Sequence, residues 1–280
     1  MSPKVEVPGV ALITGAASGI GQSIALAFAQ AGCSRLALLD RNEDGLVSTK
    51  VLAHEVIVAN GRHAQIATYD CDVSSPEAMA SIYASVKATF DRIDYSIHCA
   101  AISGIGRPTA DTPIEDFDKL NSVDYRGLWL CCREALRNMR TQALDSEVYH
   151  DADIPSHRAQ RGAIVNISSG LALYAQANSA PYCGAKAAVL GLTRADAIDY
   201  ATERIRVNSI LPGVIETPMT SSDPKRKAWM EANPVQKTPF KRFGKPDEVA
   251  DVAVFLAGNR ASYVSGASWA VDGGFIAGYN

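Results

Sequence analysis

Short apolar runs recur along the chain, and the stretches between them carry apolar residues at helical spacing. A continuous apolar run of about 4–8 residues is typical of a strand buried on both faces of a parallel sheet. The predicted strands are 10–14, 35–40, 63–70, 95–100, 163–168, 205–211 and 268–274. Because strands and helices alternate, we expect an α/β fold with a doubly wound, seven-stranded parallel sheet and helices on both faces.

Several helical stretches carry a proline in the predicted first turn, where a missing amide donor costs nothing. The predicted helices are 20–31, 42–60, a helix from 76, 113–141, a helix from 180 and 246–257. We expect a single domain over residues 1–280, with a flexible N-terminus at 1–8, an insertion at 141–161 and a substrate flap at 216–240. The alternative for the flap is an ordinary surface helix packed at one end.

A glycine-rich turn joins the first predicted strand to the first predicted helix. It reads Thr14-Gly15-Ala-Ala-Ser-Gly19-Ile20-Gly21, and its glycines permit a tight turn and a close approach of the backbone to a pyrophosphate. The negative charge of a pyrophosphate is favoured at the N-terminus of a helix. The turn therefore predicts a dinucleotide site on a Rossmann fold.

The second predicted strand ends in Asp40. A carboxylate at this place accepts hydrogen bonds from the adenosine ribose hydroxyls and repels a 2′-phosphate, which favours NAD over NADP. Arg41 argues the other way, because an arginine can clamp that phosphate. We expect NAD. The alternative is that Asp40 only caps the helix that follows.

Ser169, Tyr182 and Lys186 form a candidate proton-transfer set. Tyr182 and Lys186 lie one helical turn apart, so their Cβ atoms share a face at about 5–6 Å. Lys186 and an oxidised nicotinamide are expected to lower the pKa of Tyr182 from about 10 toward neutrality. Ser169 follows a strand end and can hydrogen-bond a substrate oxygen. The alternative is a core-packed tyrosine beside a lysine that reaches to water.

The glycine turn and the Ser-Tyr-Lys set together resemble the short-chain dehydrogenase/reductase family over about residues 7–274. The resemblance implies that Tyr182 exchanges a proton, that Lys186 lowers its pKa and holds the nicotinamide ribose, and that Ser169 orients the substrate. It also implies a homodimer or homotetramer and no metal. The implied cofactor contacts are Gly15, Ser18, Gly19, Ile20, Gly21, Asp40, Arg41, Asp72, Val73, Ala100, Tyr182, Lys186, Pro212, Gly213, Ile215 and Thr217.

Two segments depart from the family pattern. The usual Asn-Ala-Gly reads Cys99-Ala100-Ala101, where we expect an effect on stability before one on catalysis. The catalytic asparagine is replaced by Asp124. In the family this asparagine kinks its helix so that a main-chain carbonyl holds a water leading from the lysine to solvent. Aspartate keeps an acceptor oxygen but has no amide donors, which leaves the survival of that relay open.

Composition narrows the possible partners. A net charge of −3 and a pI near 6.0 give no reason to expect nucleic acid or an anionic membrane as a partner. No apolar run reaches transmembrane length, and residues 1–9 lack the apolar middle of a signal peptide, so a cytoplasmic location is expected. The six cysteines form no Cys-x-x-Cys pair and are expected to be reduced.

The insertion at 141–161 is long and polar. It contains His150, Asp151, Asp153 and His157, which we interpret as solvated loop residues in preference to a metal site. A helix-to-strand connection in a parallel sheet lies at the edge opposite the ligand-binding edge. We therefore expect the insertion to contact a partner subunit or solvent, and not substrate. A solvated or partly disordered segment is the alternative.

The expected function is NAD-dependent interconversion of a secondary alcohol and a ketone. Two alternatives remain at this level: a non-redox isomerase, cyclase or lyase that uses Tyr182 as acid and base, and a dinucleotide-sensing binding protein. Apolar residues near the expected pocket favour a bulky hydrophobic substrate of terpenoid, steroid or polyketide type. They are Ile102, Leu171, Leu173, Tyr174, Met219 and Trp229.

Overall fold

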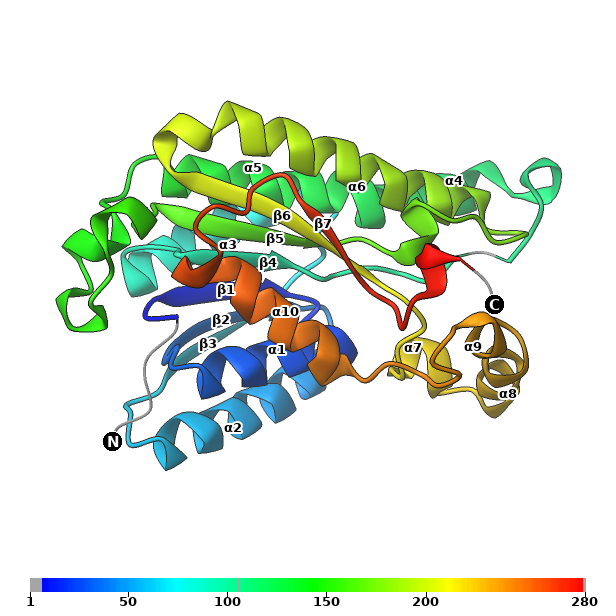
Figure 1. The fold of residues 1–280 in the computed structure, drawn as a ribbon, viewed down its shortest axis with the longest axis horizontal. Helices are drawn as coiled ribbons and strands as arrows, with labels where there is room; N and C mark the ends of the chain where they lie inside the picture. The colour runs from blue at the N-terminus through cyan, green and yellow to red at the C-terminus, as the bar shows by residue number, and fades with distance from the viewer. Residues whose placement is uncertain (1–6, 105, 279–280) are drawn as a thin grey trace.

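A computed structural model describes residues 7–104 and 106–278. Its centre is a seven-stranded sheet in the order β3-β2-β1-β4-β5-β6-β7, and every neighbouring pair is parallel. The strands are β1 Val10–Thr14, β2 Arg35–Asp40, β3 Gln65–Asp70, β4 Tyr95–His98, β5 Gly162–Ile167, β6 Ile205–Pro212 and β7 Ser268–Val271. This confirms the predicted doubly wound fold, shown in Figure 1.

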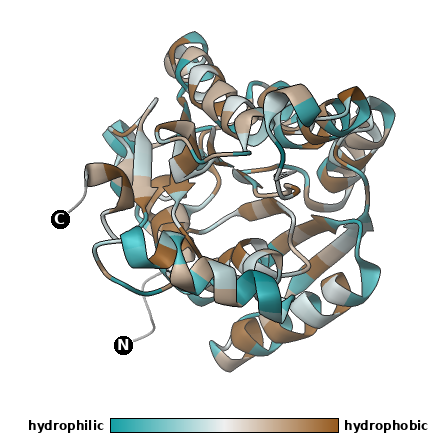
Figure 2. Ribbon diagram, turned by 90° about the vertical axis from the view of Figure 1, so that its right-hand side faces the viewer, coloured by the Kyte–Doolittle hydropathy of each residue, from teal (hydrophilic) through white to brown (hydrophobic). Residues whose placement is uncertain are grey.

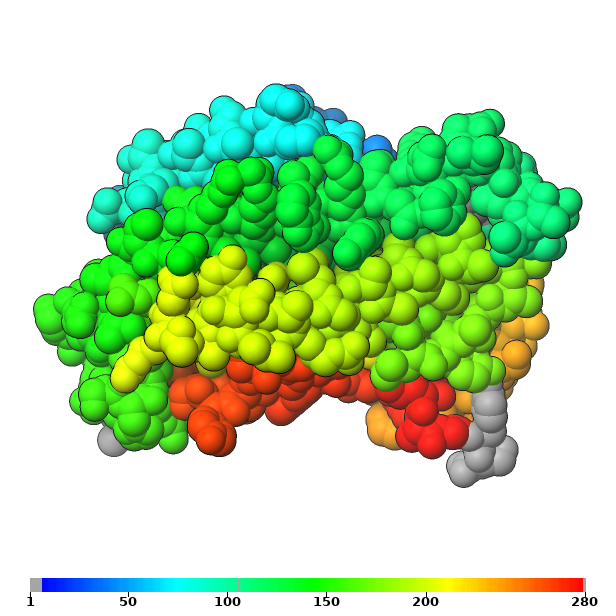
Figure 3. Space-filling model, turned by 90° about the horizontal axis from the view of Figure 1, so that it is seen from above, coloured from blue at the N-terminus to red at the C-terminus, as the bar shows by residue number. Residues whose placement is uncertain are grey.

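Helices cover both faces of the sheet (Figure 1). One layer holds α1, α2 and α10, and the other holds α3, α5 and α6, whose outer surfaces are seen from above in Figure 3. The helices are α1 Gly19–Gln30, α2 Glu43–Ala59, α3 Pro76–Phe90, α4 Ile114–Asn121, α5 Leu128–Met139, α6 Ala180–Asp199, α7 Pro218–Ser221, α8 Pro224–Ala232, α9 Pro234–Lys237 and α10 Pro246–Ala257.

The continuous apolar run of β1 follows from this layering. Successive side chains of a strand point to opposite faces. Ala11 and Ile13 accordingly belong to the core beneath α1, α2 and α10, whereas Val10 and Leu12 belong to the core beneath α3, α5 and α6. Figure 2 shows the hydrophobic strands between the two helical layers. Each such side chain contributes roughly 1.5–3 kcal/mol by leaving water.

Three sequence-based boundaries were wrong. The helix predicted at 113–141 is interrupted by the π-helical segment Ser122–Gly127 between α4 and α5. The strand predicted at 95–100 ends at His98, because the amides of Cys99 and Ala100 donate to the side-chain oxygen of Thr14 at 3.0 and 3.1 Å instead of continuing the ladder. The last strand likewise ends at Val271.

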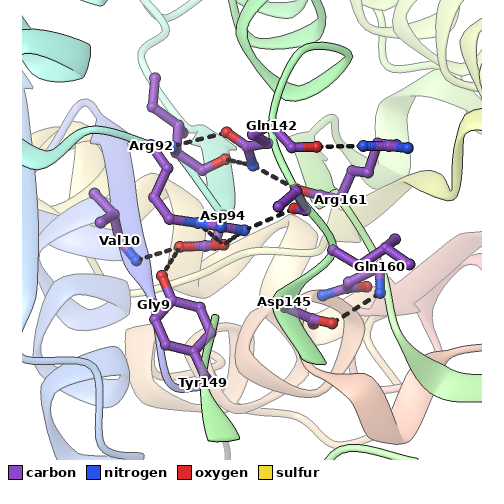
Figure 4. Close-up of polar contacts among 12 residues, drawn as sticks. Gly9, Val10, Arg92, Asp94, Gln142, Asp145, Tyr149, Gln160 and Arg161 are labelled. Carbon is purple, nitrogen blue, oxygen red and sulfur yellow. Dashed lines mark hydrogen bonds and ion pairs between the residues drawn. The ribbon is translucent and has the colours of Figure 1, made fainter. Parts of the chain in front are cut away.

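The insertion at 141–161 lies at the opposite end of the sheet from α7, α8 and α9 (Figure 1). It is attached through Tyr149, whose hydroxyl donates to Asp94 Oδ2 at 2.7 Å and accepts from Arg35 at 2.8 Å (Figure 4). The guanidinium carbons of Arg35 and Arg92 lie 5.4 and 5.2 Å from the Tyr149 ring centroid. Asp94 also accepts from the amide of Val10 at 2.9 Å. These partners lie at or just before the first residues of strands. This agrees with the prediction that the insertion lies at the edge of the sheet opposite the ligand-binding edge.

A second group of contacts fixes the two ends of the insertion. Asp145 is buried and accepts from the amide of Gln160 at 2.9 Å and from the side chain of Asn259 at 2.8 Å. Gln142 and Arg161 each donate to the other's main-chain carbonyl. Three short 3₁₀ turns fill the segment. The disordered alternative is therefore not what the structure shows.

Candidate active site

The N-terminal end of α1 borders a cavity of about 300 Å³ at the carboxyl ends of the strands. Gly15 and Gly19 have φ of +69° and +55°, which other residues rarely adopt. A Cβ at Gly15 would also lie 2.8 Å from the amide nitrogen of Ala100. Ser18 precedes α1 without a side-chain cap, so the first amides of α1 keep free donors that can face a phosphate.

Asp40 lines this cavity at the end of β2. Its two carboxylate oxygens accept from the amides of Ala17 at 3.1 Å and Asn42 at 3.0 Å. The residue that caps α2 is Asn42, whose side chain accepts from the amide of Gly45 at 3.1 Å. The helix-cap alternative for Asp40 is therefore wrong. Its carboxylate is held by backbone at the cavity wall, where a ribose diol would fit.

The predicted proton-transfer residues come together at the same cavity. Ser169 follows β5 and begins a short 3₁₀ turn, with its hydroxyl accepting from the amide of Leu171 at 3.1 Å. Tyr182 lies in the first turn of α6, where the nearby Ser169 side chain lowers the pKa of its phenol. The Lys186 ammonium lies 5.6 Å from the Tyr182 ring centroid, as the four-residue spacing predicts.

Asp124 lies in the π-helical segment and is fully buried. One carboxylate oxygen accepts from the amide of Ile102 at 2.8 Å, and the other lies 3.2 Å from the Lys186 ammonium. Burial disfavours the charge on Lys186, but Asp124 and Tyr182 outweigh it and raise the pKa of the ammonium. The lysine is therefore held as a cation by a direct ion pair.

Without a cofactor cation, the pKa of Tyr182 lies above its ordinary value, although Lys186 lowers it as expected. Burial raises the pKa of the phenol above its ordinary value, and this effect exceeds the lowering by Lys186. Asp124 raises the pKa further, while the hydrogen bond from Ser169 lowers it. The sequence-based argument counted Lys186 and the nicotinamide cation, but neither the burial nor the carboxylate can be inferred from the Tyr-x-x-x-Lys spacing.

A second cavity, of about 430 Å³, adjoins the first and shares Ser169 and Tyr182 with it. Its apolar wall includes Leu171, Met219 and Trp229, as predicted. Ile102, Leu173 and Tyr174, also predicted, are absent from its described lining; Leu173 is 62% exposed, and Tyr174 packs edge-on against Phe275 at 5.1 Å. The other described lining residues are Ser103, Gly104, Gly106, Gly170, Gln176, Ala177, Asn178, Ser179, Pro212, Gly213, Val214, Thr220, Arg226, Met230, Pro234 and Phe275.

Comparison with known proteins identifies the family. A family model described as enoyl-(acyl carrier protein) reductase matches residues 15–276. The short-chain dehydrogenase anuF of Penicillium roqueforti is 33% identical, over 96% of each chain. The chain is a short-chain dehydrogenase/reductase.

Solved structures agree with this assignment. The crystal structure of levodione reductase matches with a TM-score of 0.83 at 32% identity, over 97% of this chain and 98% of that one. The 3-ketoacyl-(acyl-carrier-protein) reductase of Brucella melitensis, complexed with NADH, matches with a TM-score of 0.78 at 26% identity, over 96% and 98% of the two chains. This short-chain dehydrogenase/reductase is accordingly an oxidoreductase of the nicotinamide-using type.

Most predicted cofactor residues of this short-chain dehydrogenase/reductase line the 300 Å³ cavity. They are Gly15, Ser18, Gly19, Ile20, Gly21, Asp40, Tyr182, Lys186, Pro212, Gly213, Ile215 and Thr217. Arg41, Asp72, Val73 and Ala100 are not among its described lining. Hydrogen bonds from Ser74 lower the pKa of Asp72, with a smaller contribution from the charge of Arg41. Ala100 instead packs behind the glycine turn.

Some lining residues were missed by sequence reasoning. One face of α8 carries Arg226 together with Trp229 and Met230, which follow it by three and four residues. Because Trp229 was predicted near the pocket, this helical spacing could have predicted Arg226 as a lining residue. Gln176 lies in a loop and Phe275 begins a short 3₁₀ turn, and neither had such a signal.

No helix within residues 7–104 and 106–278 is long and apolar enough to cross a membrane.

Proposed function

We propose that this enzyme interconverts a secondary alcohol and a ketone with NAD as the redox partner. The observation that carries the proposal is that Ser169 and Tyr182 stand in the wall shared by the two cavities. A substrate oxygen between them would be within reach of both hydroxyls, with its carbon facing the neighbouring cavity.

Proton and hydride move separately. In the oxidative direction the hydroxyl proton passes to the Tyr182 phenolate as the C–H bond breaks and the carbonyl forms, and Ser169 holds the oxygen by a hydrogen bond. NAD, when bound, would accept the hydride that leaves the substrate carbon. In the reductive direction Tyr182 donates its proton to the carbonyl oxygen. The raised pKa of Tyr182 favours this protonated form at neutral pH.

Lys186 and Asp124 support Tyr182 from behind. The Lys186 cation stabilises the phenolate, and the Asp124 carboxylate keeps the lysine charged and in place. The Lys186 ammonium has three donors, so it can keep its 3.2 Å ion pair with Asp124 and also donate to a ribose hydroxyl. Asp124 thus contributes a charge that the family's asparagine lacks.

The choice of NAD over NADP rests on Asp40. Its carboxylate is held at the cavity by the amides of Ala17 and Asn42, so it cannot turn away from a 2′-phosphate without losing both bonds. A phosphate beside it would meet a like charge at close range. Arg41 is exposed and outside the described lining of the cavity, which weakens the case for a phosphate clamp.

The test is hydride transfer by the purified protein. NADH with a panel of cyclic and aryl ketones should give loss of absorbance at the reduced-nicotinamide band, and NAD with the corresponding alcohols should give a gain. NADPH should serve poorly. Absence of turnover with every member of the panel, although the protein binds NADH, would favour the non-redox alternative.

A further inference from the structure

The larger cavity has one charged side chain in its described wall, that of Arg226 on α8. The other side chains around it are apolar or neutral, among them Leu171, Met219, Trp229 and Met230. No acidic residue occurs in the part of the lining that the structure describes. The cavity that would hold substrate therefore combines apolar walls with a single positive charge.

Arg226 is half-buried, and it makes no side-chain hydrogen bond or ion pair with any residue of 7–104 or 106–278. Lys225 is also without such a contact but is exposed to water, whereas three other cations nearby are paired. Lys227 and Lys245 both pair with Glu216, at 3.0 and 2.5 Å, and Arg242 pairs with Glu248 at 2.7 Å. A guanidinium partly withdrawn from water is costly unless an anion or acceptor reaches it.

A second polar group borders the same cavity without a partner. The Gln176 side chain is half-buried and makes no hydrogen bond within the described residues. Its amide offers two further donors. Arg226 and Gln176 together offer more donors than the one amide oxygen can accept, which is compatible with a ligand that supplies acceptors.

We propose that the substrate is a hydrophobic hydroxy or keto acid, whose carboxylate binds Arg226 while its reacting oxygen lies between Ser169 and Tyr182. This rests on the proposed function and specifies the substrate class of that site. A guanidinium binds a carboxylate through two parallel hydrogen bonds. A carboxylate matches the single positive charge of this wall, whereas a phosphate dianion would leave a negative charge unpaired among apolar side chains.

The experiment compares matched ketone pairs. The panel is 4-acetylbenzoate, 4-oxocyclohexanecarboxylate and a 3-oxo bile acid, each against its own methyl ester, with NADH as reductant. For the scaffold that turns over best, kcat/KM of the acid should exceed that of the ester by at least about 10-fold, mainly through KM, because hydrogen bonds to a charged group are the strong ones.

Variants at neighbouring positions of α8 isolate the charge. Arg226→Gln should lower the acid-to-ester ratio of kcat/KM by roughly 10- to 100-fold, and Arg226→Lys should lower it less because the charge remains without the fork. Lys225→Gln is the matched control, since Lys225 is an exposed cation outside the cavity lining. It should leave the ratio unchanged. Thermal unfolding of all variants checks the fold.

The outcomes separate this inference from the proposed function. Turnover of esters at least as good as that of acids, or an acid preference that survives Arg226→Gln, would overturn the role of Arg226 and leave the oxidoreductase activity standing. If Lys225→Gln also lost the preference for acids over esters, the preference would come from the general positive charge of α8 and not from Arg226. That result would also overturn the proposal. Failure of every acid and ester would count against the proposed ketone reduction itself.

Discussion

The ammonium of Lys186 and the carboxylate of Asp124 lie 3.2 Å apart, and both side chains are almost fully buried. The family pattern has a neutral asparagine where this chain has Asp124. The exchange places a negative charge behind the cation that is expected to acidify Tyr182. Asp124 and burial together raise the pKa of Tyr182, although Lys186 opposes them.

This pair predicts the direction of a pH shift. Ionisation of Tyr182 creates a negative charge that Asp124 repels, so Asp124→Asn should lower the pKa of the phenol. The acidic limb of kcat/KM for alcohol oxidation should then move to lower pH. The asparagine keeps an acceptor for the Ile102 amide. Asp118→Asn, an exposed change on α4, is the control. An unmoved limb, or one that moves to higher pH, would refute the electrostatic role of Asp124.

Tyr182→Phe removes the proton-transferring oxygen and little else. Turnover should fall more than about 100-fold, since general acid–base catalysis contributes roughly 10²–10⁴-fold. NAD affinity should stay close to that of the wild type. Lys186→Ala should reduce both, because Lys186 lines the cofactor cavity. Steady-state rates and NADH fluorescence titration measure the two effects. More than about a hundredth of the wild-type rate in Tyr182→Phe would contradict the assignment.

Asp40→Ala should change the cofactor preference. Loss of the carboxylate removes a ribose acceptor and the repulsion of a 2′-phosphate, so NAD should bind about 10-fold more weakly and NADP more tightly. Titration of both dinucleotides against wild type and variant is the measurement. Asp44→Ala, on the exposed start of α2, serves as control. Tighter binding of NADP than of NAD by the wild type would overturn the NAD proposal.

Tyr149→Phe tests the placement of the insertion. The variant loses the bond to Asp94 at 2.7 Å and the bond from Arg35 at 2.8 Å, so the free energy of unfolding in urea should fall by about 1–3 kcal/mol. The Michaelis constants should not change, because the insertion lies at the opposite end of the sheet from α7 and α8 (Figure 1), which line the two cavities. Tyr200→Phe is the control, since the Tyr200 hydroxyl makes no hydrogen bond within the described residues and its ring, which contacts Arg140, is kept. A raised KM at unchanged stability would show that the insertion reaches an active site.

The assembly remains a prediction. A homodimer or homotetramer is expected, with the insertion extending the interface or limiting it to one pairing mode. Sedimentation equilibrium of the wild type, compared with a chain in which a Gly-Ser turn replaces 141–161, measures the subunit number. A monomeric wild type would contradict the expectation. The shortened chain should also be less stable, because it loses the contacts of Asp145 and Tyr149.

The sequence alone determined the succession of strands and helices along the chain and the local parts of the site. All seven strands were predicted, and the central ones are continuous apolar runs because helices cover both of their faces, whereas β3 and β7 at the sheet edges are partly exposed. The glycine turn and the Tyr182–Lys186 pair depend on backbone conformation and on one helical turn, and both are short-range properties. Even the edge at which the insertion lies follows from the topology of parallel strands.

Tertiary structure decided the features that join distant segments. Asp124 and Lys186 are 62 positions apart, and only the packing of the π-helical segment against α6 makes them an ion pair. The pKa of Tyr182 depends on its burial by the whole fold and on Asp124, and both raise it against the lowering by Lys186. Of the three consecutive cations Lys225, Arg226 and Lys227 on α8, only Arg226 is in the described lining of the larger cavity, and the cavity exists only in the folded chain. Solvation and long-range contact are properties of the folded chain, and local spacing does not contain them.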